Sequence, residues 1–178
     1  MKSASESKVQ EAIFSFCCEQ DTDIENFLKN TAIRFEKISK SRTYLLVDEV
    51  ELTRQKFNVL AYFTIALRVL KISDLGLSKT QIKKLDGFSA IKKDEPITDF
   101  PVFLVGQIGK NDAFKKSIKG NQVLEYAMSV IGRAQDEVGG RIVLAECDDN
   151  PKLIKFYKDN GFIILNTDEM VQLIRIID

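Results

Sequence analysis

The chain contains no histidine, and this absence removes a large part of enzyme chemistry. Without imidazole there is no Ser-His or Cys-His nucleophile pair, no histidine-ligated zinc or iron, and no histidine general base. Proton transfer is left to carboxylates, lysine, tyrosine, cysteine or water.

Cysteine is scarce and is not arranged as a structural staple. Cys17, Cys18 and Cys147 form an odd set in which two residues are adjacent, which is neither a disulfide framework nor a metal-site spacing. We expect buried, reduced thiols and no bound metal. The 178 residues can bury a core without such staples. Because repeats and long linkers are absent, the sequence predicts a single domain over residues 1–178.

Neither an excess of one charge nor a long apolar run is present. Lys+Arg 26 and Asp+Glu 26 cancel, which disfavours nucleic-acid binding through bulk charge and leaves room only for a local basic patch. No stretch approaches the roughly 20 apolar residues of a membrane helix, and the first residues lack the apolar centre of a signal peptide. No basic amphipathic helix indicates binding at a membrane surface. We therefore predict a cytoplasmic protein without membrane contact.

The spacing of apolar residues predicts a mixed α/β fold. The charged stretch 48–56 separates two strands rich in aromatic and β-branched residues, which indicates a hairpin. Gly139 and Gly140 end a long helix. We expect helices at 6–16, 23–37, 79–85, 121–138 and 151–160, and strands at 43–47, 57–67, 102–108, 141–147, 162–165 and 170–176.

A lysine-rich turn precedes the helix expected at 121–138. The N-terminus of a helix exposes unpaired N–H groups and the positive end of the helix dipole, so it favours anions. Four lysines surround this turn: Lys110, Lys115, Lys116 and Lys119. A phosphate site and a solvated lysine-rich loop both fit this segment, which has neither a dinucleotide fingerprint nor a P-loop.

The segment 150–162, with the sequence NPKLIKFYKDNGF, is the second informative region. Pro151 suits the first turn of a helix that Asp149 or Asn150 can cap. Tyr157 carries a phenol that could donate a proton near the end of the preceding strand. A tyrosine at the boundary of a core is, however, usually a packed residue.

Together these two segments resemble the GNAT superfamily of acyl-CoA-dependent N-acetyltransferases. Asn150 and Tyr157 lie in the pattern N-x-x-x-(apolar)-x-F-Y-x-x-x-G-F, which is similar to the last helix of that family. The residues after 104 are similar to its fourth strand and pyrophosphate loop, written R/Q-x-x-G-x-G/A. In that frame Lys115 holds the first position, Ile118 replaces the first glycine and Gly120 keeps the last.

The resemblance implies a mixed, mostly antiparallel central sheet, flanked by helices and splayed between its fourth and fifth strands, here 102–108 and 141–147. It also implies that acetyl-CoA pairs with the exposed strand edge through its pantetheine arm and places its pyrophosphate on loop N–H groups. The implied cofactor contacts are Ile108, Gly109, Lys110, Lys115, Lys116, Ser117, Ile118, Lys119, Gly120, Asn121 and Asn150.

The resemblance further implies that Tyr157 is the general acid that protonates the coenzyme A thiolate. Its phenol, near pKa 10 when unperturbed, is close enough to a thiol near 8.5 for transfer. Glu146, at the end of the fifth strand, is a candidate general base, with a surface carboxylate as the alternative. Ile118 is the departure from the family, because a β-branched side chain replaces the glycine that lets the backbone approach the pyrophosphate.

The resemblance extends over 21–176 and is closest to a subgroup that includes toxins of toxin–antitoxin pairs, which acetylate the α-amino group of aminoacyl-tRNA. We predict transfer of an acetyl group to a primary amine by direct attack. Two alternatives stay open: a toxin-like enzyme with tRNA on a basic face, and a degenerate GNAT fold that only binds. A homodimer and an antitoxin partner also stay open. The basic face would include Lys83, Lys84, Lys92 and Lys93.

Overall fold

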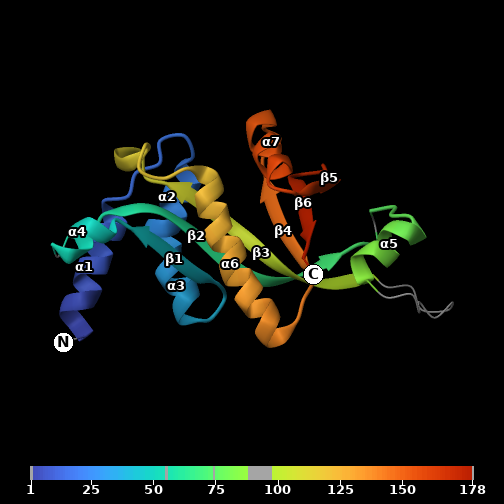
Figure 1. Ribbon diagram of the computed structural model, residues 1–178, viewed down its shortest axis with the longest axis horizontal. Helices are drawn as coiled ribbons and strands as arrows, with labels where there is room; N and C mark the ends of the chain where they lie inside the picture. Colours follow the sequence, from blue (N-terminus) through green and yellow to red (C-terminus); the bar gives the residue numbers. More distant parts are fainter. Residues whose placement is uncertain (1, 55, 74, 88–97, 178) are drawn as a thin grey trace. The chain divides into compact units, whose positions relative to one another are not determined.

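The structure is a computed structural model that describes residues 2–54, 56–73, 75–87 and 98–177. Lys92 and Lys93 therefore lie outside the described residues. Figure 1 follows the elements along the chain. The strands are β1 (Arg42–Val47), β2 (Val59–Lys71), β3 (Asp99–Lys110), β4 (Ile142–Cys147), β5 (Ile163–Asn166) and β6 (Val171–Ile176). The helices are α1 (Lys2–Phe14), α2 (Thr22–Asn26), the π-helix η1 (Phe27–Thr31), α3 (Ala32–Lys37), α4 (Glu49–Thr53), α5 (Lys79–Asp86), the 3-10 helix η2 (Asp112–Phe114), α6 (Gly120–Val138) and α7 (Pro151–Asp159).

The strands form a mixed sheet in the order β1-β2-β3-β4-β6-β5. β1 pairs with β2, β4 with β6 and β5 with β6 in antiparallel fashion, whereas β3 and β4 are parallel. β3 and β4 are the strands that the GNAT numbering counts as fourth and fifth. Their register joins three residue pairs, from Phe103 with Val143 to Val105 with Ala145, while β3 continues to Lys110 and β4 to Cys147. The predicted mixed, mostly antiparallel sheet is confirmed.

The chain divides into two compact units. Unit 1 consists of Met1–Ala66 and Gly106–Ser129, and unit 2 of Leu67–Val105 and Val130–Asp178. β2, β3 and α6 therefore have residues in both units. The single domain expected over residues 1–178 stays a prediction.

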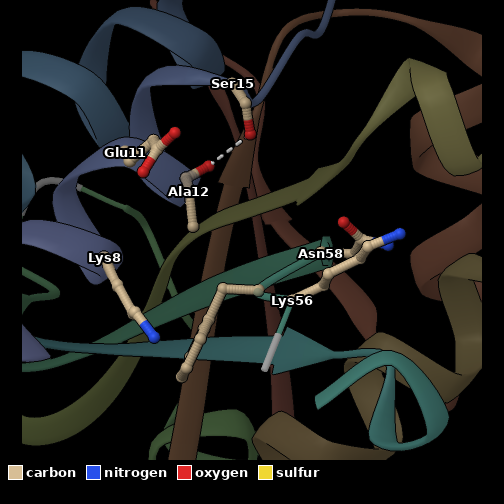
Figure 2. A pocket seen from close by; sticks show the side chains of 7 residues that line it. Lys8, Glu11, Ala12, Ser15, Lys56 and Asn58 are labelled. Atoms are coloured by element: carbon tan, nitrogen blue, oxygen red, sulfur yellow. Dashed lines mark hydrogen bonds between the residues drawn. The ribbon is translucent and has the colours of Figure 1, made fainter. Parts of the chain in front are cut away.

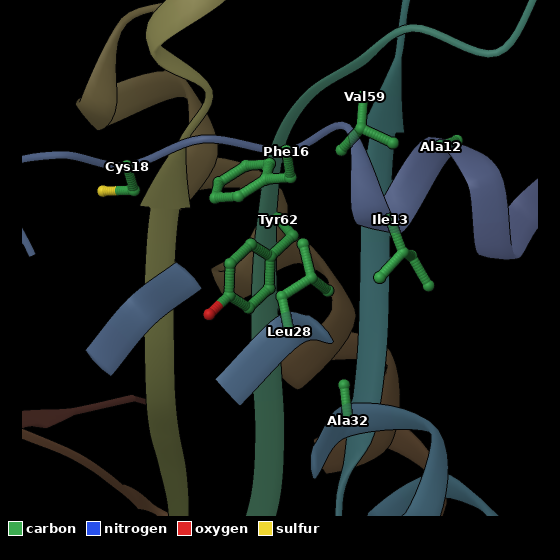
Figure 3. Close-up of a cluster of buried hydrophobic side chains, with 8 residues drawn as sticks. All are labelled: Ala12, Ile13, Phe16, Cys18, Leu28, Ala32, Val59 and Tyr62. Atoms are coloured by element: carbon green, nitrogen blue, oxygen red, sulfur yellow. The ribbon is translucent and has the colours of Figure 1, made fainter. Parts of the chain in front are cut away.

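Unit 1 has its own apolar core, in which the rings of Phe16 and Tyr62 lie next to one another (Figure 3). Both side chains are fully buried, and the rings meet edge to face with centroids 5.3 Å apart. The Tyr62 hydroxyl donates a hydrogen bond of 2.6 Å to the carbonyl of Ile24 in α2. Burial raises the pKa of Tyr62 well above its ordinary value, so this phenol is a neutral donor. The buried members of this core are Ala12, Ile13, Phe16, Cys18, Leu28, Ala32, Val59 and Tyr62.

Unit 2 is built around a second apolar core. The short helix α5 is attached to it through Leu85, and a capping box between Ser78 and Gln81 begins that helix. Such reciprocal caps satisfy two of the free N–H groups at a helix start. The buried members are Leu70, Ile72, Leu85, Phe100, Val102, Ile142, Leu144 and Ile174.

The local structure differs from the sequence prediction at two places in unit 1. The helix expected at 23–37 contains a π-helical turn, Phe27–Thr31, between α2 and α3. The predicted hairpin connection folds into α4, because the Asp48 carboxylate accepts hydrogen bonds from the N–H groups of Val50 and Glu51. In the described part of the chain, none of the helices combines the length and the apolar character needed to cross a bilayer.

Candidate functional site

The structure places the predicted site residues in two groups. Residues from Ile108 to Asn121 belong to unit 1, and Glu146, Asn150 and Tyr157 belong to unit 2.

In unit 1, the loop after β3 ends at the N-terminus of α6, a helix of 19 residues. The Gln122 side chain turns back and accepts a 2.9 Å hydrogen bond from the N–H of Lys119. The N–H of Ser117 donates to the carbonyl of Phe114. Within the described residues, the N–H groups of Ile118, Gly120 and Asn121 have no acceptor. These free donors at the positive end of a helix form the kind of site that holds an anion.

Ile118 lies in this loop with its side chain buried, 8% exposed. From the sequence, a β-branched residue here either crowds a bound pyrophosphate or sends the loop along a different path. Because the side chain is turned into the protein, it leaves the N–H groups beside it uncovered. That this loop holds a pyrophosphate without the missing glycine stays a prediction.

Of the four loop lysines, two are engaged within unit 1. The Lys110 ammonium donates to the carbonyl of Lys115 at 3.0 Å, and the Lys115 ammonium lies 3.2 Å from a carboxylate oxygen of Asp112. Lys116 and Lys119 are exposed and form no ion pair with a described residue. Lys116 and Lys119 therefore supply the positive charge that remains available at the helix start.

Asn111 positions the beginning of this loop, a role that the sequence pattern does not predict. The residue is 1% exposed. Its side-chain amide donates to the carbonyl of Val59 at 2.9 Å, and its amide oxygen accepts from the N–H groups of Ala113 and Cys17 at 3.1 and 3.4 Å. A buried amide with several partners fixes the loop, and only an asparagine directly after a strand signals it in the sequence.

Gly109 is required for close packing at the end of β3. A Cβ atom there would lie 2.4 Å from Cγ2 of Ile24 and 2.8 Å from Cε1 of Tyr62. No side chain fits at such distances. Gly109 therefore holds β3 against α2 and the unit 1 core, besides its predicted cofactor contact.

The three cysteines are free, with Cys18 and Cys147 buried and Cys17 half-buried. The sulfur of Cys17 and carboxylate oxygens of Glu19 and Asp112 lie within 4.8 Å of one another. The Asp112 carboxylate already accepts a 2.7 Å hydrogen bond from the N–H of Glu19, and this bond, followed by Lys115, lowers the pKa of Asp112. Burial and neighbouring carboxylates raise the pKa of the Cys17 thiol, which disfavours the thiolate that a metal needs.

In unit 2, Glu146 follows the last residue of β4 that is paired with β3. Its carboxylate forms an ion pair with the Arg68 guanidinium and accepts a 2.8 Å hydrogen bond from the Gln172 side chain. Both carboxylate oxygens therefore have a protein donor, and the role of general base stays a prediction.

Asn150 and Pro151 begin α7 as the sequence predicts. The Asn150 side chain accepts a 2.9 Å hydrogen bond from the N–H of Lys152, and Pro151 occupies the first turn. This cap uses the amide oxygen of Asn150, while its amide nitrogen forms no bond to a described residue. A contact between that nitrogen and a cofactor stays a prediction.

Tyr157 is buried in α7, with its side chain 7% exposed. Its ring packs edge to face against Phe156 and Phe162, with centroids 5.1 and 5.4 Å away. Burial, followed by the Cys147 thiol, raises the pKa of Tyr157 above its ordinary value, so the phenol stays protonated. In the described part of the chain no group bonds to its hydroxyl, which differs from the bonded hydroxyl of Tyr62.

Unit 1 also contains a pocket of about 350 Å³ that no motif in the sequence predicts. Lys8 and Glu11 of α1 and Ser15, directly after that helix, line one side of it, and Lys56 and Asn58 line another (Figure 2). The Ser15 hydroxyl donates to the carbonyl of Ala12 at 2.8 Å. None of the predicted site residues lines this pocket.

The order and pairing of the strands, with a parallel β3–β4 pair that ends after three residue pairs, is that of the GNAT fold. Solved structures with this fold include bacterial toxins. AtaT in complex with acetyl-methionyl-tRNAfMet is 23% identical in sequence, with a TM-score of 0.69 over 90% of this chain and 85% of that chain. A tyrosine-to-phenylalanine variant of KacT is 25% identical, with a TM-score of 0.70 over 92% and 86%.

A third structure is a tyrosine-to-phenylalanine variant of AtaT bound to acetyl-CoA and to the C-terminus of the antitoxin AtaR. It is 20% identical, with a TM-score of 0.66 over 93% of this chain and 85% of that chain. No family model matches the sequence, and no curated protein matches it. The solved structures of AtaT and KacT confirm, through their fold, the predicted resemblance to the toxin-like GNAT subgroup.

Proposed function

We propose that this protein transfers an acetyl group from acetyl-CoA to the α-amino group of an aminoacyl-tRNA. The observation that carries the proposal is the buried ring of Tyr157, whose hydroxyl bonds to no described residue. A phenol without a protein partner is a proton donor available to a ligand.

Acetyl-CoA supplies an activated thioester carbonyl and a thiol leaving group. The N–H groups of Ile118, Gly120 and Asn121 hold its pyrophosphate, and the exposed Lys116 and Lys119 add positive charge. Charge-assisted bonds from N–H groups and ammonium groups to phosphate are among the stronger hydrogen bonds in proteins. The remaining proposed contacts are Ile108, Gly109, Lys110, Lys115, Ser117 and Asn150.

Tyr157 delivers the proton of its hydroxyl to the departing sulfur. Glu146 accepts the proton that the attacking amine loses. Because the amine attacks only when unprotonated, holding it beside the thioester is the main task of the site, and proximity of this kind contributes several kcal/mol to catalysis, on the order of 7–11.

The acceptor is proposed on two grounds. AtaT, which has this fold, was solved with an acetylated aminoacyl-tRNA. In addition, exposed lysines lie on both units: Lys79, Lys83 and Lys84 on α5, and Lys116 and Lys119 before α6. A tRNA needs such local positive charge because its phosphates dominate affinity, although the net charge of the chain is zero.

The test uses radiolabelled acetyl-CoA and bulk tRNA charged with all amino acids. The expected result is label on the charged tRNA, none on the same tRNA after deacylation, and binding that weakens steeply with salt. Label on small amines but on no charged tRNA would overturn the tRNA proposal and leave an amine acetyltransferase. Calorimetry that detects no acetyl-CoA binding at millimolar concentration would instead favour a degenerate fold that only binds other partners.

A further inference from the structure

Glu146 occupies a distinctive place in unit 2. It is the first residue of β4 beyond the register with β3, and its side chain is 18% exposed. Arg68 of β2 pairs with one carboxylate oxygen, and Gln172 of β6 donates to the other at 2.8 Å. Side chains of two other strands, β2 and β6, therefore hold the Glu146 carboxylate at the point where the pairing of β3 with β4 stops.

The hydrogen-bond capacity of the carboxylate is only half used. An ionised carboxylate has about four lone-pair sites, and here each oxygen accepts one donor. Arg68 and Gln172 therefore restrict rotation of the carboxylate and leave each oxygen able to accept a further bond. The Arg68 side chain is 48% exposed, and exposed ion pairs contribute little to stability. Orientation is a better explanation of the arrangement than stability.

We propose that Arg68 and Gln172 are positioning residues that hold Glu146 in the orientation in which it receives the proton of the acceptor amine. This inference rests on the proposed function. As the bond from nitrogen to the carbonyl carbon forms, the N–H bond breaks and its proton passes to Glu146. The carbon–sulfur bond breaks with its electron pair on sulfur, which takes the Tyr157 proton. Solvent then returns a proton to Tyr157 and removes one from Glu146.

A double-mutant cycle tests this inference with charged tRNA as acceptor. Arg68→Ala is expected to lower kcat about tenfold, a modest loss for a misplaced catalytic group, with KM for acetyl-CoA unchanged. Arg68→Lys keeps the charge and should restore part of the loss. In the Glu146→Gln background the same Arg68→Ala change should alter kcat less than about twofold, because the effects of substitutions at coupled residues are not additive.

Two further variants complete the design. Gln172→Leu should behave as Arg68→Ala does, and it keeps the cycle usable if the arginine variant does not fold. Arg133→Ala removes an exposed arginine of α6 and should leave kcat unchanged. Equal losses from Arg68→Ala in both Glu146 backgrounds, or no loss in either, would overturn the positioning role while the wild-type enzyme stays active. A wild-type protein that transfers no acetyl group overturns the proposed function and this inference together.

Discussion

Replacing Tyr157 by phenylalanine separates proton donation from packing. The change removes a single hydroxyl and keeps the ring between Phe156 and Phe162. Since this hydroxyl bonds to no described residue, its loss leaves no buried partner unsatisfied. We expect the melting temperature to change by less than about 2 °C.

The effect on turnover should be large. A positioned general acid contributes about 100-fold to 10,000-fold, so kcat should fall at least about 100-fold, which corresponds to roughly 2.7 kcal/mol of activation free energy. The pyrophosphate contacts are proposed on the loop before α6, so the affinity for acetyl-CoA should stay within about twofold, the pattern of an interaction made only in the transition state.

Tyr62→Phe is the matched control. Tyr62 is also buried, but its hydroxyl donates to the Ile24 carbonyl at 2.6 Å. Its removal should cost about 1 kcal/mol of unfolding free energy and lower the melting temperature by about 2–4 °C. Because Tyr62 has no proposed part in the reaction, kcat should remain unchanged.

Three measurements decide the outcome for the two variants: initial rates with labelled acetyl-CoA and charged tRNA, calorimetry with acetyl-CoA, and thermal unfolding. The two variants should show opposite patterns in rate and stability. A Tyr157→Phe protein that is less stable but turns over as fast as the wild type would refute proton donation and leave Tyr157 as a packed core residue.

Three further predictions concern stability. Asn111→Ala leaves the Val59 carbonyl and two N–H groups without their partner and should lower the unfolding free energy by about 1–3 kcal/mol in urea titrations; an unchanged midpoint would contradict the role of Asn111 in fixing the loop. Gly109→Ala places a methyl group 2.4 Å from Ile24 and should lower the unfolding free energy by about 1–3 kcal/mol, which is measurable as a lower melting temperature. Gly132→Ala is the control: a Cβ there meets no neighbour, so the melting temperature should not fall. Burial raises the pKa of Tyr157, so above pH about 10 the unfolded phenol ionises while the folded one does not, and stability falls by about 1.36 kcal/mol per pH unit. Tyr157→Phe should remove this part of the alkaline loss, and identical pH profiles of the two proteins would count against the shift.

The apolar spacing predicts the order of strands and long helices because those elements bury one periodic face. β4 follows from a run of four apolar residues, and α7 begins where Asn150 and Pro151 indicate. The π-helical turn Phe27–Thr31 is not predictable in this way, because its residues keep a helical apolar pattern.

The sequence identifies only those residues of the candidate site that lie in a recognisable motif. Tyr157 and the loop before α6 come from the resemblance, whereas Arg68 reaches Glu146 across 78 positions of sequence, a separation at which local pattern has no information. The orientation of Ile118 was equally out of reach, since a β-branched residue in a loop can face inward or outward depending on the backbone path. Composition likewise shows the absence of imidazole but not which tyrosine keeps a free hydroxyl.

The contacts of Asn111 also bear on the order in which the protein can take shape during synthesis. Its side chain reaches Cys17 and Val59, residues made 94 and 52 positions earlier. The first third of the polypeptide is therefore synthesised before Asn111, which completes its hydrogen bonds. Contacts between residues that lie far apart in the sequence slow folding. Premature release before residue 111 would yield a fragment whose Val59 carbonyl lacks its native donor.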